Sequence, residues 1–327
     1  MIEQQSLKIN PSEVGERIDQ LLADKFSQYS RSYFSRLIKN KDVLVNGDNV
    51  KPAYILKEHD NISVVFKEDA TISELEGEDI ALDIIFENDD IIVLDKQPGI
   101  VVHPAAGNRT GTLVHALVNH FPKITEAVYD SQNEVSRTRP GLVHRLDKGT
   151  SGVMIVAKNS RAMHSLSRQI QNRTVEKIYW GLCYGWPKID EGRLTSFLGR
   201  SPKNRRQIAD VGEGKGKEAI TGFKVLKCYT LKNSERISLL EFNLHTGRTH
   251  QIRVQTADMG NPILGDIVYG NKTSMKASSQ LNIKRQLLHA KKITISLPGD
   301  DKSTQFEAAI PEEFTVVIKQ LTEISDK

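Results

Sequence analysis

The sequence contains little cysteine, few aromatic residues and no long apolar run. Only two of its 327 residues are cysteines, Cys183 and Cys228, and they match neither a disulfide framework nor a zinc-binding spacing, which fits a reducing cytoplasm. No apolar run approaches the roughly 20 residues of a membrane span. Residues 1–5 show neither a basic nor an apolar segment, so we expect no signal peptide. These absences exclude a disulfide-rich secreted domain and a membrane-spanning protein.

Charge is almost balanced over the whole chain but unevenly distributed along it. The 45 Lys and Arg residues exceed the 41 Asp and Glu residues by a formal +4. Residues 68–90 hold ten carboxylates and no Lys or Arg, which leaves +14 for the remainder of the chain. A basic body with a separate acidic segment favours a polyanionic partner, although a surplus of this size can also serve only to keep a protein soluble.

Residues 15–66 have the pattern of a small α/β module. Two amphipathic helical segments precede a strand at 43–45, the hairpin turn Asn46-Gly47 and a closing strand at 62–66. The outer face of the second helical segment carries four cations, namely Arg31, Arg36, Lys39 and Lys41. A helix edge of this kind can contact phosphates without reading bases. The alternative is an amphipathic helical hairpin whose basic face is merely solvated.

This module resembles the αL RNA-binding motif, a small fold named after a ribosomal small-subunit protein. The matching residues are Arg17-Ile18-Asp19, Ser30-Arg31-Ser32, Leu37-Ile38, Val43-Leu44-Val45-Asn46-Gly47, Lys51-Pro52 and Asp60-Asn61-Ile62. The resemblance implies that the module binds RNA.

The acidic residues 67–80 separate this module from the rest of the chain. They include few large apolar side chains and are therefore predicted to form a flexible or extended linker. In residues 81–327, strand-like and helical segments follow one another without a strict βαβ rhythm. We expect an α+β domain with a mixed, mainly antiparallel central sheet and flanking helices.

The most informative stretch of this second domain is the loop at 141–152. It is rich in glycine and leads into the apolar, β-branched run 153–157, which is typical of a buried strand. Asp147 lies in this loop between Arg145 and Lys148, and basic neighbours favour an ionised carboxylate that can act as a nucleophile or base. The alternative is a solvated turn in which Asp147 pairs with Lys148.

Residues 192–217 carry seven Lys or Arg residues, Arg205 and Arg206 among them, against two acidic residues. The segment is weakly apolar and contains several glycines, so we predict a basic loop suited to a phosphate backbone. The glycines at 212, 214 and 216 do not belong to a P-loop, because the required G-x-x-x-x-G-K-[ST] spacing is missing. A plain solvated loop is the alternative.

A helix is predicted to begin near Thr249, after the turn His245-Thr246-Gly247-Arg248. On such a helix Thr249, Ile252 and Arg253 share a face. An arginine close to a helix start and to the amides of a glycine turn makes an anion site. The anion could be a phosphate or the Asp147 carboxylate, and the alternative is a structural ion pair of Arg253 elsewhere.

Several separated motifs now agree with one family. In order they are Lys96-Gln97-Pro98-Gly99, Val102-His103-Pro104, His144-Arg145-Leu146-Asp147, Thr150-Ser151-Gly152, Lys177-Ile178-Tyr179, Thr246-Gly247-Arg248-Thr249-His250-Gln251-Ile252-Arg253, Leu264-Gly265-Asp266, Tyr269-Gly270 and Leu288-His289-Ala290. This ordered set resembles the RluA-type pseudouridine synthase family. With the αL module in front, the whole chain is similar to the RluD-like enzymes of large-subunit ribosomal RNA.

The resemblance implies an isomerase that converts uridine to pseudouridine in RNA without a cofactor or metal ion. The expected partner is large-subunit ribosomal RNA or its precursor particle, and the expected enzyme is a cytoplasmic monomer. Asp147 matches the essential carboxylate of the family. Whether it attacks the sugar, attacks the base at C6 or removes a 2′ proton stays open at this point.

The resemblance also implies roles for the residues around Asp147. Tyr179 would stack on the uracil and assist removal of the C5 proton, and Arg253 would pair with Asp147. Ile252 would line an apolar pocket. The remaining residues expected at the RNA are His144, Arg145, Arg205 and Arg206, of which Arg145 would fill the gap left by a flipped-out uridine.

Two other functions fit the same sequence. A protein that only binds RNA and assists ribosome assembly would need no more than the αL module and the basic loop. The same isomerase chemistry could also act on tRNA, because target choice depends on RNA shape and on loops.

Overall fold

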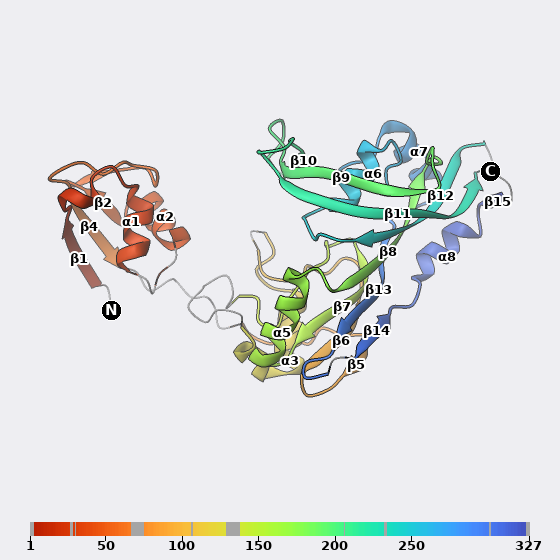
Figure 1. Cartoon of the computed structure of the whole chain (residues 1–327), viewed down its shortest axis with the longest axis horizontal. Helices are drawn as coiled ribbons and strands as arrows, with labels where there is room; N and C mark the ends of the chain where they lie inside the picture. Colours follow the sequence, from red (N-terminus) through yellow and green to blue (C-terminus); the bar gives the residue numbers. More distant parts are fainter. Residues whose placement is uncertain are drawn as a thin grey trace. The chain divides into compact units, whose positions relative to one another are not determined.

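The structure, a computed structural model, describes residues 3–26, 29, 31–66, 75–105, 107–128, 138–205, 207–231, 234–300 and 302–324. The chain divides into two compact units (Figure 1), residues 1–76 with 128–140 and residues 77–127 with 141–327. Residues 67–74 of the predicted linker lie outside the described residues, and so does Arg206.

The smaller unit is a four-stranded antiparallel sheet, in the order β1-β4-β2-β3, with two α-helices. Its elements are β1 (Glu3–Lys8), the 3-10 helix η1 (Pro11–Glu13), α1 (Ile18–Lys25), α2 (Arg31–Lys39), β2 (Val43–Val45), β3 (Asp48–Asn49) and β4 (Asn61–Phe66). Asn46 and Gly47 both have positive φ angles, as the predicted hairpin turn between β2 and β3 requires. The core is rich in aromatic side chains, and Phe34 on α2 packs edge-on against Phe66 on β4.

A buried carboxylate ties the two helices of this unit together. Asp19 on α1 accepts hydrogen bonds from Arg17 and from Arg31 on α2. Burial acts to raise the pKa of Asp19, but the two arginines outweigh it and hold the pKa below its ordinary value. One cation of the predicted basic face, Arg31, is therefore partly neutralised, while Lys39 and Lys41 are exposed.

The larger unit is built on an eleven-stranded sheet. Its path is β10-β9-β11-β12-β8-β13-β7-β6-β5, with β14 paired to β13 and β15 to β11. The strands are β5 (Ile84–Glu87), β6 (Ile91–Lys96), β7 (Ser151–Ala157), β8 (Glu176–Tyr184), β9 (Glu191–Arg200), β10 (Ile208–Asp210), β11 (Lys217–Thr230), β12 (Arg236–Leu244), β13 (Leu288–Ser296), β14 (Ser303–Glu307) and β15 (Thr322–Ile324). Among the described strands of this sheet, only β7 and β13 pair in parallel. The predicted α+β class and mixed, mainly antiparallel sheet are confirmed.

Helices lie against this sheet as expected for an α+β domain. They are α3 (Leu113–His120), the 3-10 helix η2 (Pro122–Glu126), α5 (Ser160–Gln171), α6 (Gln251–Asp258), α7 (Lys272–Gln280) and α8 (Glu312–Ile318). Every residue of β7 is buried, in agreement with its apolar, β-branched sequence, and α5 packs against it (Figure 1). No helix in the described part of the chain combines the length and apolar character of a membrane span.

The prediction of one basic loop over residues 192–217 was wrong. Half of the segment is strand, because β9 continues to Arg200, β10 covers 208–210 and β11 begins at Lys217. Buried and exposed residues alternate over part of β9, and Leu198 packs with Ala219 and Val254. The few apolar residues of this stretch are enough to form a strand, because only one face of the sheet is covered here. In the connection between β9 and β10, the residues that are described as exposed are 202–205.

Candidate active site

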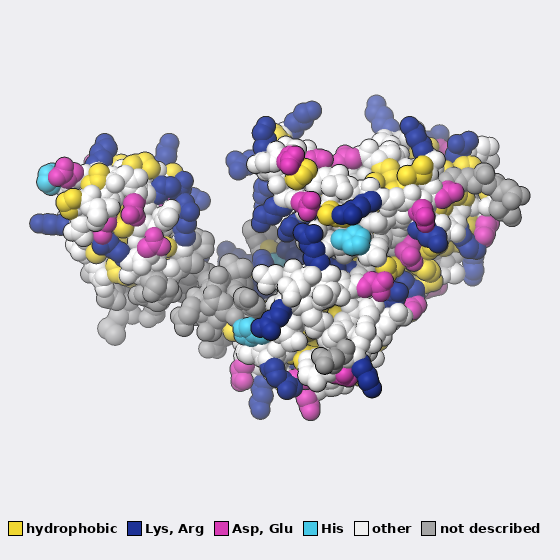
Figure 2. All heavy atoms as spheres, in the orientation of Figure 1, with side chains coloured by type: hydrophobic (Ala, Val, Ile, Leu, Met, Phe, Trp, Pro, Cys, Tyr) yellow, Lys and Arg dark blue, Asp and Glu magenta, His cyan; other side chains and the backbone are white. Residues whose placement is uncertain are grey.

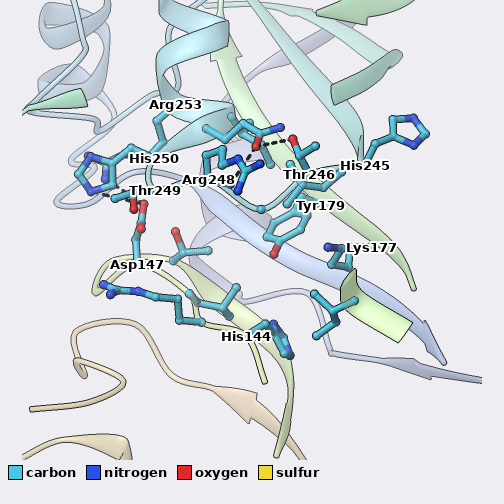
Figure 3. A pocket seen from close by; sticks show the side chains of 18 of the residues that line it. His144, Asp147, Lys177, Tyr179, His245, Thr246, Arg248, Thr249, His250 and Arg253 are labelled. Carbon is cyan, nitrogen blue, oxygen red and sulfur yellow. Dashed lines mark hydrogen bonds and ion pairs between the residues drawn. The ribbon is translucent and has the colours of Figure 1, made fainter. Parts of the chain in front are cut away.

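The larger unit contains a cavity of about 460 Å³. It is lined by the loop before β7, by the first half of β8, and by the turn between β12 and α6 (Figure 3). Asp147, Tyr179 and Arg253 all line this cavity, together with His144, Arg145 and Ile252. Arg205 is exposed outside it, and nothing is described for Arg206. The structure therefore brings together the side chains that the sequence predicts around Asp147.

Asp147 is held by one strong ion pair. Its Oδ2 atom lies 3.0 Å from Nη1 of Arg253, and 18% of its side chain is exposed. Among the described residues, Asp147 does not pair with Lys148 as the alternative of a solvated turn would require. The backbone carbonyl of Lys148 instead accepts hydrogen bonds from the amide of Gly99 at 2.7 Å and from Nζ of Lys96 at 3.4 Å. The loop is thus fixed through its backbone while the carboxylate faces the cavity.

Lys96 holds this loop through hydrogen bonds to backbone carbonyls. Its side chain is only 1% exposed, and its Nζ atom donates to the carbonyls of Gln97 and Ile100 as well as that of Lys148. Burial lowers the pKa of Lys96 to about 7. Three carbonyl acceptors are what a buried ammonium group needs, so Lys96 serves to hold the loop and not to react.

Asp266 fixes the direction of Arg253. This carboxylate is 1% exposed and accepts two hydrogen bonds from Arg253, at 2.7 Å from Nε and at 2.9 Å from Nη2. It also accepts the backbone amides of Val268 and Tyr269. Burial acts to lower the pKa of Arg253, but the two carboxylates raise it above its ordinary value, so the guanidinium stays charged. The sequence contained Asp266 within a motif but gave it no role.

His250 is a second residue without a sequence-based role. It immediately precedes α6 with a left-handed backbone (φ +56°), and its Nε2 atom lies 3.9 Å from Oδ2 of Asp147. Its Nδ1 atom is hydrogen-bonded to the hydroxyl of Tyr269 at 2.8 Å. Burial lowers the pKa of His250 despite the nearby Asp147, so the ring is neutral at neutral pH. Helix α6 begins at Gln251, two residues later than predicted.

Tyr179 lies on β8 and is 7% exposed. Burial, with a further contribution from Asp147, raises the pKa of its phenol above the ordinary value, so the hydroxyl keeps its proton. Two residues earlier on the same strand, Lys177 lines the same cavity (Figure 3). Lys177 was part of a motif in the sequence but was not singled out.

His144 and Arg145 take different positions at the cavity. Nε2 of His144 accepts the backbone amide of Ile155 on β7 at 2.9 Å, and burial lowers the pKa of the ring to about 3. His144 is therefore a neutral residue that joins the loop to the strand. Arg145 is exposed, with Nη1 3.3 Å from Nε2 of His103, which leaves its guanidinium at the surface.

The described residues contain no group of three His, Cys, Asp or Glu side chains placed to hold a metal ion. Cys183 and Cys228 are both buried.

Comparisons with known proteins identify the class of this fold and site. A family model described as RNA pseudouridylate synthase matches residues 90–258, and an S4 domain model matches residues 16–62. The chain is 38% identical to an "Uncharacterized RNA pseudouridine synthase" of Chlorobaculum parvum, with 97% of both chains covered. It is 39% identical to the "Ribosomal large subunit pseudouridine synthase D" of Neisseria meningitidis serogroup B, over 91% of this chain and 77% of that protein.

A solved structure shows the same fold. The human RNA Pseudouridylate Synthase Domain Containing 1 aligns with a TM-score of 0.58 and 24% identity, over 76% of this chain and 91% of that chain. The chain belongs to the RNA pseudouridine synthase family. It is accordingly an RNA-modifying isomerase with an N-terminal S4 domain.

Proposed function

We propose that this enzyme converts uridine to pseudouridine at specific positions of large-subunit ribosomal RNA, with Asp147 as the catalytic carboxylate. One observation carries the assignment of Asp147. It is the only carboxylate among the described residues that line the cavity, and a buried, bidentately held arginine points at it. Similarity to relatives named for the large ribosomal subunit supports the choice of RNA.

The reaction breaks the bond between N1 and C1′, joins C1′ to C5, and exchanges the C5 proton for one on N1. Three starting steps suit a carboxylate at this place: attack on C1′, addition to C6, or removal of the 2′ proton. Each step begins from an ionised Asp147, and the charged Arg253 at 3.0 Å favours that form. Because the carboxylate is still 18% exposed, a nucleoside can reach it.

The other cavity residues complete the site. A uridine inside an RNA helix must leave its stack to reach a side chain in this cavity. The ring of Tyr179 would then support the uracil, and the exposed Arg145 would occupy the gap that the uridine leaves in the RNA. His250 would help to position Asp147, and Asp266 would position Arg253.

RNA outside the cavity would be held by phosphate contacts. The S4 domain offers the exposed Lys39 and Lys41, and the larger unit offers the exposed Arg205. The sequence places Arg206 next to Arg205. Figure 2 shows Lys and Arg side chains on the visible faces of both units. Such contacts position an RNA and make its binding depend on salt.

The test is to map pseudouridine in the RNA of a strain that lacks this protein. We expect sites in the large-subunit ribosomal RNA to be lost and to return with the wild-type gene but not with Asp147→Asn. Loss of tRNA sites alone would move the substrate to tRNA. Tight binding to ribosomal RNA without any lost site would favour the assembly-factor function and reject the proposal.

A further inference from the structure

Lys177 is a buried cation that faces the cavity without a partner. It is 8% exposed, and within the described part of the chain its ammonium group makes no hydrogen bond or ion pair. Burial lowers its pKa, as expected for a charge that nothing compensates. A ligand that enters the cavity can supply the acceptor that this ammonium group lacks.

The register of β8 places Lys177 beside the expected position of the base. Residues two apart on a strand point to the same side, and Lys177 and Tyr179 line the same cavity. In Figure 3, Tyr179 is seen between Lys177 and Asp147. If the ribose lies at Asp147 and the uracil lies against Tyr179, the edge of the uracil farthest from the ribose points toward Lys177.

The other cations of the cavity differ from Lys177. Arg145, Arg173 and Arg248 are exposed, where a hydrated phosphodiester can meet them. Lys177 is instead accompanied by the buried side chains of Leu244 and Leu288. The other buried cation of the cavity, Arg253, is paired with Asp147 and Asp266. Apolar walls, a phenol and a buried cation without a carboxylate partner suit a flat, uncharged base whose carbonyl oxygens accept hydrogen bonds.

We propose that Lys177 is a further catalytic residue, which donates a hydrogen bond to a carbonyl oxygen of the uracil and stabilises the negative charge that develops there. The proposal rests on the proposed function and names a contact within it. The contact between Lys177 and the uracil is the same whichever step Asp147 performs.

All three routes place negative charge on the base. If the N1–C1′ bond breaks, by attack on C1′ or after loss of the 2′ proton, its electron pair goes to N1 and is shared with O2 and O4. If Asp147 adds to C6, the C5–C6 π pair moves through C4 to O4 as an enolate. The negative charge on the base disappears when C5 bonds to C1′, and the proton that C5 then loses is balanced by a proton gained at N1. Lys177 keeps its own proton throughout, and its fixed charge stabilises the intermediate electrostatically.

The first test compares single-turnover rates and RNA affinities of Lys177→Met and wild type. We expect the variant to be roughly 100- to 1,000-fold slower, the usual effect of losing one such donor, with an unchanged dissociation constant and salt dependence. Lys177→Arg, which keeps the charge, should restore part of the rate. Lys224→Met removes an exposed lysine on β11 outside the cavity and should react at the wild-type rate.

The second test replaces the acceptor and works even if Lys177→Met folds poorly. RNA with 4-thiouridine or 2-thiouridine at the target has a weaker acceptor at O4 or O2, so one of them should slow the wild-type enzyme. The same substitution should make no further difference in Lys177→Met. Equal sulfur effects in both proteins, or an unchanged rate in Lys177→Met, would overturn the role of Lys177 while leaving the proposed function intact.

Two other outcomes are also decisive. Weaker RNA binding with a reduced salt dependence in Lys177→Met would show that its partner is a phosphate and not the base. A wild-type enzyme that forms no pseudouridine on any unmodified RNA would reject the proposed function itself, and the role of Lys177 with it.

Discussion

At the scale of single residues, the proposed active site is a series of charged groups in which each group positions the next. Asp266 is buried and holds Arg253 with two hydrogen bonds, and Arg253 extends its remaining Nη1 to Asp147. Because Asp266 also accepts two backbone amides, the whole series is anchored to the turn at 266–269. Asp147 is therefore positioned through Arg253 by Asp266 and the turn at 266–269, which do not line the cavity.

Asp266→Asn tests this positioning. The amide cannot supply the second anionic acceptor for Arg253, so we expect the isomerisation rate to fall by about 10- to 100-fold at unchanged RNA affinity. Melting should also occur at a lower temperature, because the variant disrupts a buried ion pair. Asp258→Asn, on the same unit but without a contact to Arg253, is the control. A wild-type rate in Asp266→Asn would mean that Asp147 holds Arg253 sufficiently by itself.

Asp95 on β6 gives a prediction about pH. Burial, and then repulsion from Asp83, raise its pKa to about 6. Between the ordinary value of 3.8 and about 6 the folded protein keeps a proton that the unfolded chain has lost, so stability falls as pH rises through this range. Asp95→Asn should therefore stabilise the protein by about 1–2 kcal/mol above pH 7 and by nothing below pH 4. Melting curves at several pH values measure this effect, and Asp89→Asn, at an exposed position, is the control. A stability difference between Asp95→Asn and wild type that does not change with pH would contradict the assignment.

Residue roles were only partly predictable from the sequence. Asp147 could be singled out because a carboxylate in a glycine-rich loop before a buried strand is a local pattern. Its pairing with Arg253, 106 residues away, came from the family resemblance and not from spacing. Lys177 and Asp266 were given no role, because the function of each depends on its surroundings in the folded protein. Lys177 is buried in the cavity wall without a partner among the described residues, and Asp266 binds Arg253.

At the scale of elements, the parallel pair β7 and β13 brings two walls of the site together. β7 follows the Asp147 loop, and β13 begins with Leu288, which lines the cavity. Gly152, whose φ angle is +114°, pairs with Ala290 in this register. A Cβ atom there would lie 2.2 Å from the carbonyl oxygen of Ala290, so no other residue fits without a shift of one strand.

Gly152→Ala should thus separate the two walls. We expect a loss of about 2–4 kcal/mol in the free energy of unfolding and a slower reaction, because both backbone strain and a clash are introduced. Gly212→Ala is the matched control, since Gly212 also has a positive φ angle but nothing within 4 Å of the added atom. Denaturant unfolding of both variants measures the difference. Equal losses would attribute the whole effect to backbone conformation and none to the strand pair.

Long apolar elements were predictable and weakly apolar ones were not. The buried strand at 153–157 was expected from its β-branched run and lies within β7. β9 was taken for part of a loop, because a strand covered on one face needs few apolar residues.

At the scale of the whole molecule, the chain combines a unit that contains the cavity around Asp147 with an S4 domain, none of whose described residues lines that cavity. The net positive charge lies mainly outside residues 68–90. This division predicts that affinity for RNA and the rate of the chemical step can be changed separately, because phosphate contacts position an RNA without taking part in bond changes.

Two paired variants test this division. Lys39→Ala with Lys41→Ala in the S4 domain, and Arg205→Ala with Arg206→Ala in the larger unit, should each weaken RNA binding and flatten its salt dependence by up to about two phosphate contacts. Single-turnover rates at saturating enzyme should stay within about threefold of wild type. Lys227→Ala is the control, because Glu323 already neutralises that ammonium at 2.8 Å. A salt dependence that stays at the wild-type value in either pair would exclude that region from the RNA interface.

The most direct measurement of the central claim follows pseudouridine formation by purified wild-type protein and Asp147→Asn on large-subunit ribosomal RNA, in a buffer with a metal chelator. Asparagine keeps the shape of the side chain and removes the negative charge that each proposed route requires. We predict that wild type modifies specific uridines, whereas the variant binds the RNA equally well and forms no product. Undiminished product from Asp147→Asn would contradict the account of this site.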